Sequence, residues 1–322
     1  MHFRSVRYTE LIRSRARVWV CWWVLVGLSV QALAQEGDPP EPEGANAPVT
    51  EPRSASVTGL GEWALARAQP ERAVWLELED DGRALGLFQP ELKTPGRGAL
   101  IVLANEGQTA GEGLSGPLLR AMSERGFAVM TLGLRAPPEA LVRRRLQPAV
   151  PQPQAPGGAD EVAGEGAGQT SVMIDVAADD ALEDLVADYR NAVRELLDAA
   201  VENLQRRGYE QPAVAGIGWS ADYVTGWAVG RDSLAGLIWL APRFPTDRLA
   251  ALPELLAADR PWQVLDLHSG EGGARRQGVE RAAALGRQQV SGYQRQAIAL
   301  ANPPQPSDAD RLASRISAWL SR

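Results

Sequence analysis

Short apolar runs alternate with longer amphipathic segments along most of the chain. Six such runs occupy residues 99–104, 127–132, 213–217, 234–240, 262–267 and 296–300. A strand that is covered on both faces has no polar side, so these runs predict strands inside a sheet. Residues 182–207 and 308–320 instead place apolar side chains three or four positions apart, which predicts helices with one buried face.

Two strands at the start of this region differ from the others because a tight turn joins them. Residues 74–79 and 84–89 flank the sequence Asp-Asp-Gly-Arg, which favours a hairpin. Strands that alternate with helices favour a parallel sheet, because each crossover places a helix on one of its faces. The pattern therefore predicts an α/β fold with a mostly parallel sheet, helices on both faces and an N-terminal antiparallel hairpin.

The first 34 residues have the pattern of an export signal. Arginines precede an apolar run at residues 18–30 that is short for a membrane span, and Ala32 and Ala34 have the spacing of a cleavage site. We expect residues 1–34 to be removed, which leaves a periplasmic protein without stable membrane insertion. A retained membrane anchor is the alternative, and tryptophans at positions 19, 22 and 23 favour it.

Two segments contain too few large apolar side chains to join a core. Residues 35–56 are mainly Pro, Glu, Gly and Ala, and residues 136–169 are rich in Pro, Gln and Gly. Such compositions cannot offset the entropy lost on ordering, so we expect a disordered leader and a disordered insert. The remaining chain, residues 57–322, is expected to form one domain around this insert.

Charge and composition exclude several functions. Among 322 residues, 33 basic and 40 acidic side chains give a net charge of −7, which argues against nucleic acid as a partner. The sequence contains one Cys and two His, so an internal disulfide and the known cysteine or histidine metal motifs are excluded. A Walker loop and a complete dinucleotide-binding motif are also missing, and we expect no metal and no cofactor.

One motif carries candidate chemistry. The predicted strand at residues 213–217 runs into Gly-Trp-Ser-Ala-Asp at residues 218–222 and then into a helical segment. Strand, turn and helix in this order are the setting of a nucleophile elbow, in which small residues flank a serine. Gly218 meets this need and Asp222 does not. Two interpretations stay open: Ser220 is a nucleophile, or it caps the helix of an ordinary glycine-rich turn.

From about residue 60 onward the chain resembles the α/β-hydrolase superfamily, and within it a branch of exported bacterial proteins defined only as a domain of unknown function. The resemblance rests on the turn at Ser220 and on residues 69–76, 99–107, 117–119, 124–128 and 234–242. It implies that the amide of Ala221 and that of Gly107 or Gln108 would hold an oxyanion. Trp219 would then lie beside the cleft.

The same resemblance exposes missing chemistry. Relatives carry His-Gly where this chain has Glu106 before a glycine, and the loop at residues 301–306 lacks the superfamily's catalytic histidine. Glu271 is the nearest equivalent of the catalytic acid, yet it has no histidine to orient. His268 is the one imidazole left to activate Ser220 in a rearranged dyad, and a structural loop histidine is the alternative.

The two remaining acidic candidates favour ordinary roles. We expect Glu106 to be a solvated loop side chain, and Asp222 to stabilise the first turn of a helix rather than to act as a base or a metal ligand. Together the residues predict an exported α/β-hydrolase-fold protein with a degenerate catalytic triad. Its expected function is non-catalytic binding of a small ligand or an envelope protein. The alternative is a weak serine esterase that uses Ser220.

Overall fold

The computed structural model describes residues 60–79, 82–146, 169–257 and 260–322, with only the backbone of residues 169–180. These residues belong to one unit, Ser54–Arg322. The predicted signal and leader, residues 1–34 and 35–56, lie outside the described residues, as do residues 147–168 of the predicted insert. For those segments the sequence predictions remain predictions.

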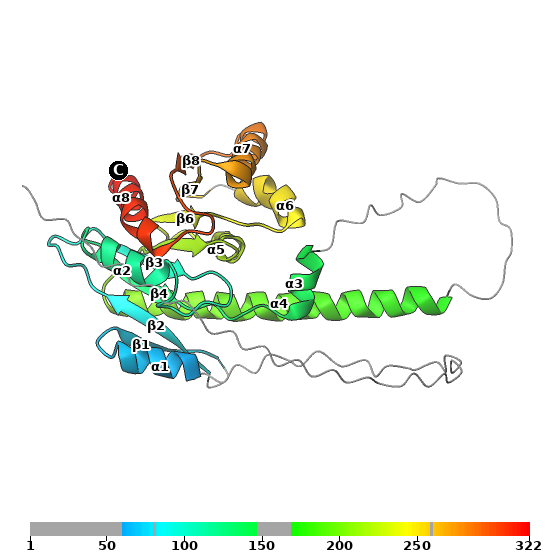
Figure 1. The fold of residues 1–322 in the computed structure, drawn as a ribbon, viewed down its shortest axis with the longest axis horizontal. Coiled ribbons are helices and arrows are strands. Elements are labelled where there is room, and N and C mark those ends of the chain that lie inside the picture. Colours follow the sequence, from blue (N-terminus) through cyan, green and yellow to red (C-terminus); the bar gives the residue numbers. More distant parts are fainter. Residues whose placement is uncertain (1–59, 80–81, 147–168, 258–259) are drawn as a thin grey trace, which may run out of the picture. The chain divides into compact units, whose positions relative to one another are not determined.

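An eight-stranded sheet in the order β1-β2-β4-β3-β5-β6-β7-β8 forms the centre of the fold (Figure 1). The strands are β1 Ala73–Glu77, β2 Arg83–Gln89, β3 Ala99–Leu103, β4 Ala128–Leu132, β5 Ala213–Ile217, β6 Gly236–Leu240, β7 Val264–Ser269 and β8 Tyr293–Ile298. Strand β2 pairs antiparallel with β1 and β4, and the other pairs of this sheet are parallel. The mostly parallel sheet and its N-terminal antiparallel hairpin are confirmed.

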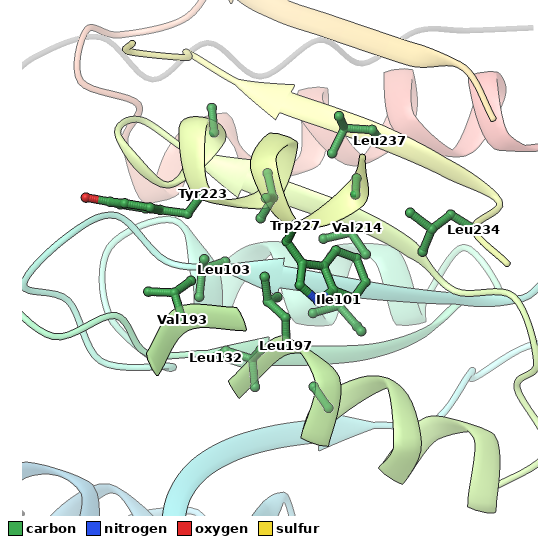
Figure 2. Close-up of a cluster of buried hydrophobic side chains, with 14 of the residues drawn as sticks. Ile101, Leu103, Leu132, Val193, Leu197, Val214, Tyr223, Trp227, Leu234 and Leu237 are labelled. Atoms are coloured by element: carbon green, nitrogen blue, oxygen red, sulfur yellow. The ribbon is translucent and has the colours of Figure 1, made fainter. Parts of the chain in front are cut away.

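Helices cover both faces of the sheet, as the alternation of patterns predicts. One core receives side chains from α4 Gln169–Arg206, α5 Ser220–Ala228, α6 Thr246–Ala257 and α7 Gly272–Arg287, and the other from α2 Ser115–Ser123 and α8 Ala309–Leu320. Figure 2 shows α4 and α5 meeting in the first core, where Leu197 and Trp227 are buried with Ile101 of β3. Full burial of such side chains stabilises the fold by roughly 1.5–3 kcal/mol each.

Burial on both faces explains why the apolar runs of the sequence predict the central strands. Every residue of β3, β4, β5, β6 and β7 is buried between the two cores. Strand β8 lies at the edge of the sheet, and of its residues only Ile298 is fully buried. The first half of β8 is polar and has no apolar pattern, so the predicted strand begins at residue 296 although β8 begins at Tyr293.

Two predicted boundaries differ from the structure. The insert predicted at residues 136–169 begins too early, because α3 Glu139–Leu146 forms there and buries Leu141 against the fold. Helix α4 begins at Gln169, well before residue 182. Two further elements, α1 Leu60–Ala68 and the short 3₁₀ helix Pro306–Asp308, complete the described part.

Among the residues that the structure describes, no helix has both the length and the apolar character needed to cross a membrane.

Candidate functional site

The turn between β5 and α5 has the geometry of a nucleophile elbow. Strand β5 ends at Ile217, Gly218 takes a positive φ of 62°, and α5 starts at Ser220. The helix crosses the strand at Gly216, where a Cβ would stand 2.8 Å from the Cα of Ala221. The residue at the tip of such a turn needs a positive φ, which glycine adopts without steric cost. Gly218 therefore forms the tip.

This geometry shifts the predicted register of the elbow by two residues. Ser220 is the first residue of the helix rather than the tip, and it is fully buried. Its hydroxyl has the carbonyl oxygens of Leu103 and Ile217 as acceptors, at 3.0 Å and 2.9 Å. Because Ser220 is 0% exposed, its hydroxyl oxygen is out of reach of a substrate in this conformation. The helix-cap alternative does not fit either, since Trp219 occupies the N-cap position.

Asn105, which follows β3, fills the space beside the tip. Its Oδ1 accepts a hydrogen bond from the backbone N–H of Trp219 at 3.0 Å. A Cβ on Gly218 would lie only 2.5 Å from the same oxygen. In a nucleophile elbow the residue at the tip supplies the nucleophile, and the next amide binds the oxyanion. The side-chain oxygen of Asn105 therefore occupies both the place of a nucleophile and the place of an oxyanion.

The predicted oxyanion donors are paired within the fold. The amides of Ala221, Gly107 and Gln108 donate to the carbonyl oxygens of Gly218 at 3.3 Å, Leu134 at 2.9 Å and Asn105 at 3.1 Å. Stabilisation of an oxyanion requires donors that are already aimed at the developing charge. These three amides would first have to leave their present acceptors.

A buried ion pair lies beside the turn. The Glu106 carboxylate accepts from Nη1 of Arg145 at 2.9 Å and 2.7 Å and from the Tyr223 hydroxyl at 2.6 Å. Nη2 of Arg145 donates to the Tyr223 oxygen at 2.8 Å, and the guanidinium carbon lies 4.4 Å from the centre of the Trp219 ring. The side chains of Arg145 and Glu106 are 9% and 7% exposed. The expectation that Glu106 is a solvated loop residue is therefore wrong.

Tyr223 reaches this ion pair from α5, and Figure 2 shows its ring with the hydroxyl pointing away from the buried Trp227. Burial and the neighbouring Glu106 carboxylate raise the pKa of Tyr223 well above its usual range, so the hydroxyl remains a donor. Burial alone would lower the pKa of Arg145, but Glu106 and Tyr223 outweigh it and raise that pKa. The guanidinium is thus held in its charged form.

The structure does not bring His268 to the elbow. His268 lies on β7, is 1% exposed, and faces α7 at Gly278, where a Cβ would collide with its Nε2. Its Nδ1 is 3.5 Å from the buried carboxylate of Asp266 on the same strand. Strand β6 separates β7 from β5, which leads to Ser220. The rearranged dyad therefore has no geometric support, and Glu271 is an exposed residue at the start of α7.

Asp222 has a structural place in the helix layer. Its Oδ1 accepts from Nε of Arg248 at 2.9 Å, and its Oδ2 lies 3.5 Å from Nη2 of Arg190. The carboxylate thus links α5 to α6 and α4, which leaves it no access to a reacting group. Nowhere in the described part do three His, Cys, Asp or Glu side chains gather as metal ligands would.

The sequence prediction missed Asn105, Arg145 and Tyr223 as members of the site. Arg145 lies within the insert predicted at residues 136–169, and no sequence signal around it predicts burial. The glycine pair at positions 216 and 218 was the available signal. In this pattern the second glycine, Gly218, directly follows the strand and forms the tip of the turn.

The strand order, the crossovers and the elbow together define an α/β-hydrolase fold. Est1E from Butyrivibrio proteoclasticus is similar, with 10% identity, a TM-score of 0.50 and coverage of 77% of this chain and 97% of that chain. The esterase domain of a Rhodothermus marinus protein has 13% identity, a TM-score of 0.48 and coverage of 78% and 97%. For the dienelactone hydrolase of Anabaena variabilis these values are 12%, 0.49, 77% and 94%. Identities this low concern the fold alone.

Within this fold the chain belongs to a particular family. Residues 17–322 match the family described as "Protein of unknown function (DUF3530)". No curated protein matches the chain. The resemblance expected from the sequence, to an α/β-hydrolase-like family of unknown function, is confirmed.

Proposed function

We propose that this protein is a non-catalytic α/β-hydrolase-fold protein, a pseudoenzyme that binds a ligand or partner beside the elbow. The arrangement at Asn105 carries this proposal. Its amide oxygen lies where a side chain at position 218 would begin, and it accepts the amide of Trp219. A hydrolase would need that place for its nucleophile and that amide for its oxyanion.

The chemistry of serine activation supports the same conclusion. A serine hydroxyl is a poor nucleophile unless a neighbouring base removes its proton. The two acceptors of the Ser220 hydroxyl are carbonyl oxygens, and the loop at residues 301–306 contains no histidine. A weak serine esterase that uses Ser220 remains the alternative, and the following experiment separates the two.

Purified protein should not hydrolyse short activated esters above the rate of a Ser220→Ala variant, and a fluorophosphonate should not label it. General-base assistance typically contributes about 10²–10⁴-fold, so without it the rate should stay near background. The Ser220→Ala control should lose about 0.5–1.5 kcal/mol of stability with the buried hydrogen bond. Fluorophosphonate labelling at Ser220 that disappears in this variant would establish the esterase and reject our proposal.

We further propose that the protein works in the cell envelope. The support is the sequence pattern of residues 1–34, with its arginines, short apolar run and small-residue cleavage site. In a bacterial host, the intact mass of the protein from the periplasmic fraction should correspond to a chain that begins at Gln35. Recovery of the full-length chain in the membrane pellet would instead establish the retained anchor.

A further inference from the structure

The ion pair beside the elbow consists of a receptor and an occupant that come from different parts of the fold. Glu106 lies in the loop after β3, and Trp219 and Tyr223 lie at the start of α5. These three residues, the receptor, therefore come from the sheet edge and from the helix packed against it. Tyr189 of α4 supports them with an edge contact to the Tyr223 ring, at 5.4 Å between centroids. The occupant, Arg145, arrives from the short helix α3.

The receptor matches a guanidinium in three independent ways. The carboxylate of Glu106 accepts from Nη1 with both of its oxygens, the Tyr223 oxygen accepts from Nη2, and the Trp219 ring lies against the face of the cation. A planar guanidinium can donate in its plane and stack on a ring at once, whereas an ammonium is a point charge. The arrangement therefore matches the geometry of a guanidinium better than that of an ammonium.

The occupant is held less completely than the receptor. The Nε of Arg145 is buried and has no hydrogen-bond partner in the described part, so only the terminal nitrogens are recognised. Leu141 is the one fully buried residue of α3, and its neighbours Arg144 and Leu146 are exposed. The contacts thus recognise the end of an arginine side chain rather than its stem or its helix.

We propose that the Glu106, Trp219 and Tyr223 receptor binds the alkylguanidinium group of a ligand, and that Arg145 occupies it in cis when the ligand is absent. This inference rests on the proposed non-catalytic function and names its ligand class. A carboxylate as buried as Glu106 is unfavourable without a compensating cation, so Arg145 leaves only when another cation replaces it. Exchange of one guanidinium for another preserves the charge balance.

Competition with Arg145 sets the expected affinities. A group tethered in cis competes at an effective concentration of up to about the millimolar range. The Arg145→Ala variant should therefore bind ethylguanidinium at least about tenfold more tightly than the wild-type protein does. Butylammonium should bind both proteins more weakly. Calorimetry at constant ionic strength measures these affinities, and Arg144→Ala on the same helix serves as the matched control that should behave as wild type.

A second variant tests the receptor itself. Glu106→Gln in the Arg145→Ala background removes the charge of the receptor and keeps its shape, and it should abolish ethylguanidinium binding. The wild-type chain supplies a measurement that does not depend on the folding of any variant. In protein labelled with ¹⁵N-arginine, the Nε–H signal of Arg145 should shift in a saturable way as ethylguanidinium is added.

A second probe distinguishes whether the guanidinium belongs to a protein partner or to a small compound. A peptide with one internal arginine that binds Arg145→Ala more tightly than ethylguanidinium would indicate a protein partner, and the reverse would indicate a small guanidino compound. Both results support the proposal. Binding to Arg145→Ala without any response of the wild-type Arg145 signal would make the ion pair a permanent structural contact and overturn it. Failure of every probe would also overturn it, while the fluorophosphonate result on the proposed function would stand.

Discussion

Replacement of Asp266 by alanine should destabilise the fold by about 3–5 kcal/mol, because it leaves a buried arginine without its counter-charge. The Asp266 carboxylate accepts from Nε and Nη2 of Arg281 at 3.0 Å and 3.1 Å and from the Tyr293 hydroxyl at 2.8 Å. Asp266 is 0% exposed and Arg281 is 3% exposed. Urea unfolding of the variant at pH 7 should show the loss as a lower midpoint with an unchanged slope.

A double variant separates the charge from the packing. Asp266→Leu with Arg281→Met replaces the pair by apolar side chains and should recover most of the lost stability, since buried ion pairs often exchange for apolar groups without cost. If the double variant is as unstable as Asp266→Ala, the loss comes from packing and the electrostatic explanation is wrong.

The same carboxylate has a pH signature. Burial alone would raise the pKa of Asp266, but His268, Arg281 and Tyr293 lower it below its ordinary value of 3.8. A lowered pKa in the folded state means that the ionised carboxylate contributes stability above pH 3.8, and that this contribution is lost as the pH falls from there through the folded-state pKa. The Asp266→Asn variant should lack this part of the acid transition.

The second large effect is expected at Gly216, where the elbow helix crosses its strand. A Cβ there would lie 2.8 Å from the N and Cα of Ala221 and from the carbonyl carbon of Ser220, so backbone would have to move. Gly216→Ala should therefore cost about 3 kcal/mol, as overpacking of a rigid site does. Thermal unfolding followed by circular dichroism measures the change.

Gly286 provides the matched control for this substitution. It lies inside α7, and a Cβ there would have no neighbour within 4 Å. Gly286→Ala should stabilise the protein by about 0.4–1 kcal/mol, because it reduces the entropy of the unfolded chain. Equal and small effects at both positions would show that helix and strand are not in close contact at the elbow.

The fold could be predicted from the sequence because its central strands are buried on both faces. Their short, continuous apolar runs are typical of strands buried on both faces, and residues 80–83 have the composition of a tight turn. The edge strand β8 and the helix α3 were predicted poorly for the opposite reason. Their burial depends on one or two side chains, such as Ile298 or Leu141, and composition averages do not register single contacts.

The candidate site was predicted poorly because the position of the elbow tip in the sequence depends on backbone conformation. A serine after two glycine positions suggests a nucleophile, but the φ of Gly218 decides which residue stands at the tip. The Arg145 ion pair joins residues 39 positions apart, and neither partner carries a local sequence signal for burial. The absence of a histidine from residues 301–306, in contrast, can be seen directly in the sequence, which contains two histidines in all.

The amide of Asn105 also bears on how this elbow can change. A serine at position 218 would place its Cβ 2.5 Å from the Asn105 oxygen, and removal of Asn105 alone would leave the Trp219 amide without its acceptor. We expect each single substitution to be less stable than the present pair, so a side chain at position 218 should be tolerated only with a second substitution at position 105. We therefore expect the two positions to be epistatic, so that the effect on stability of a substitution at one depends on the residue at the other.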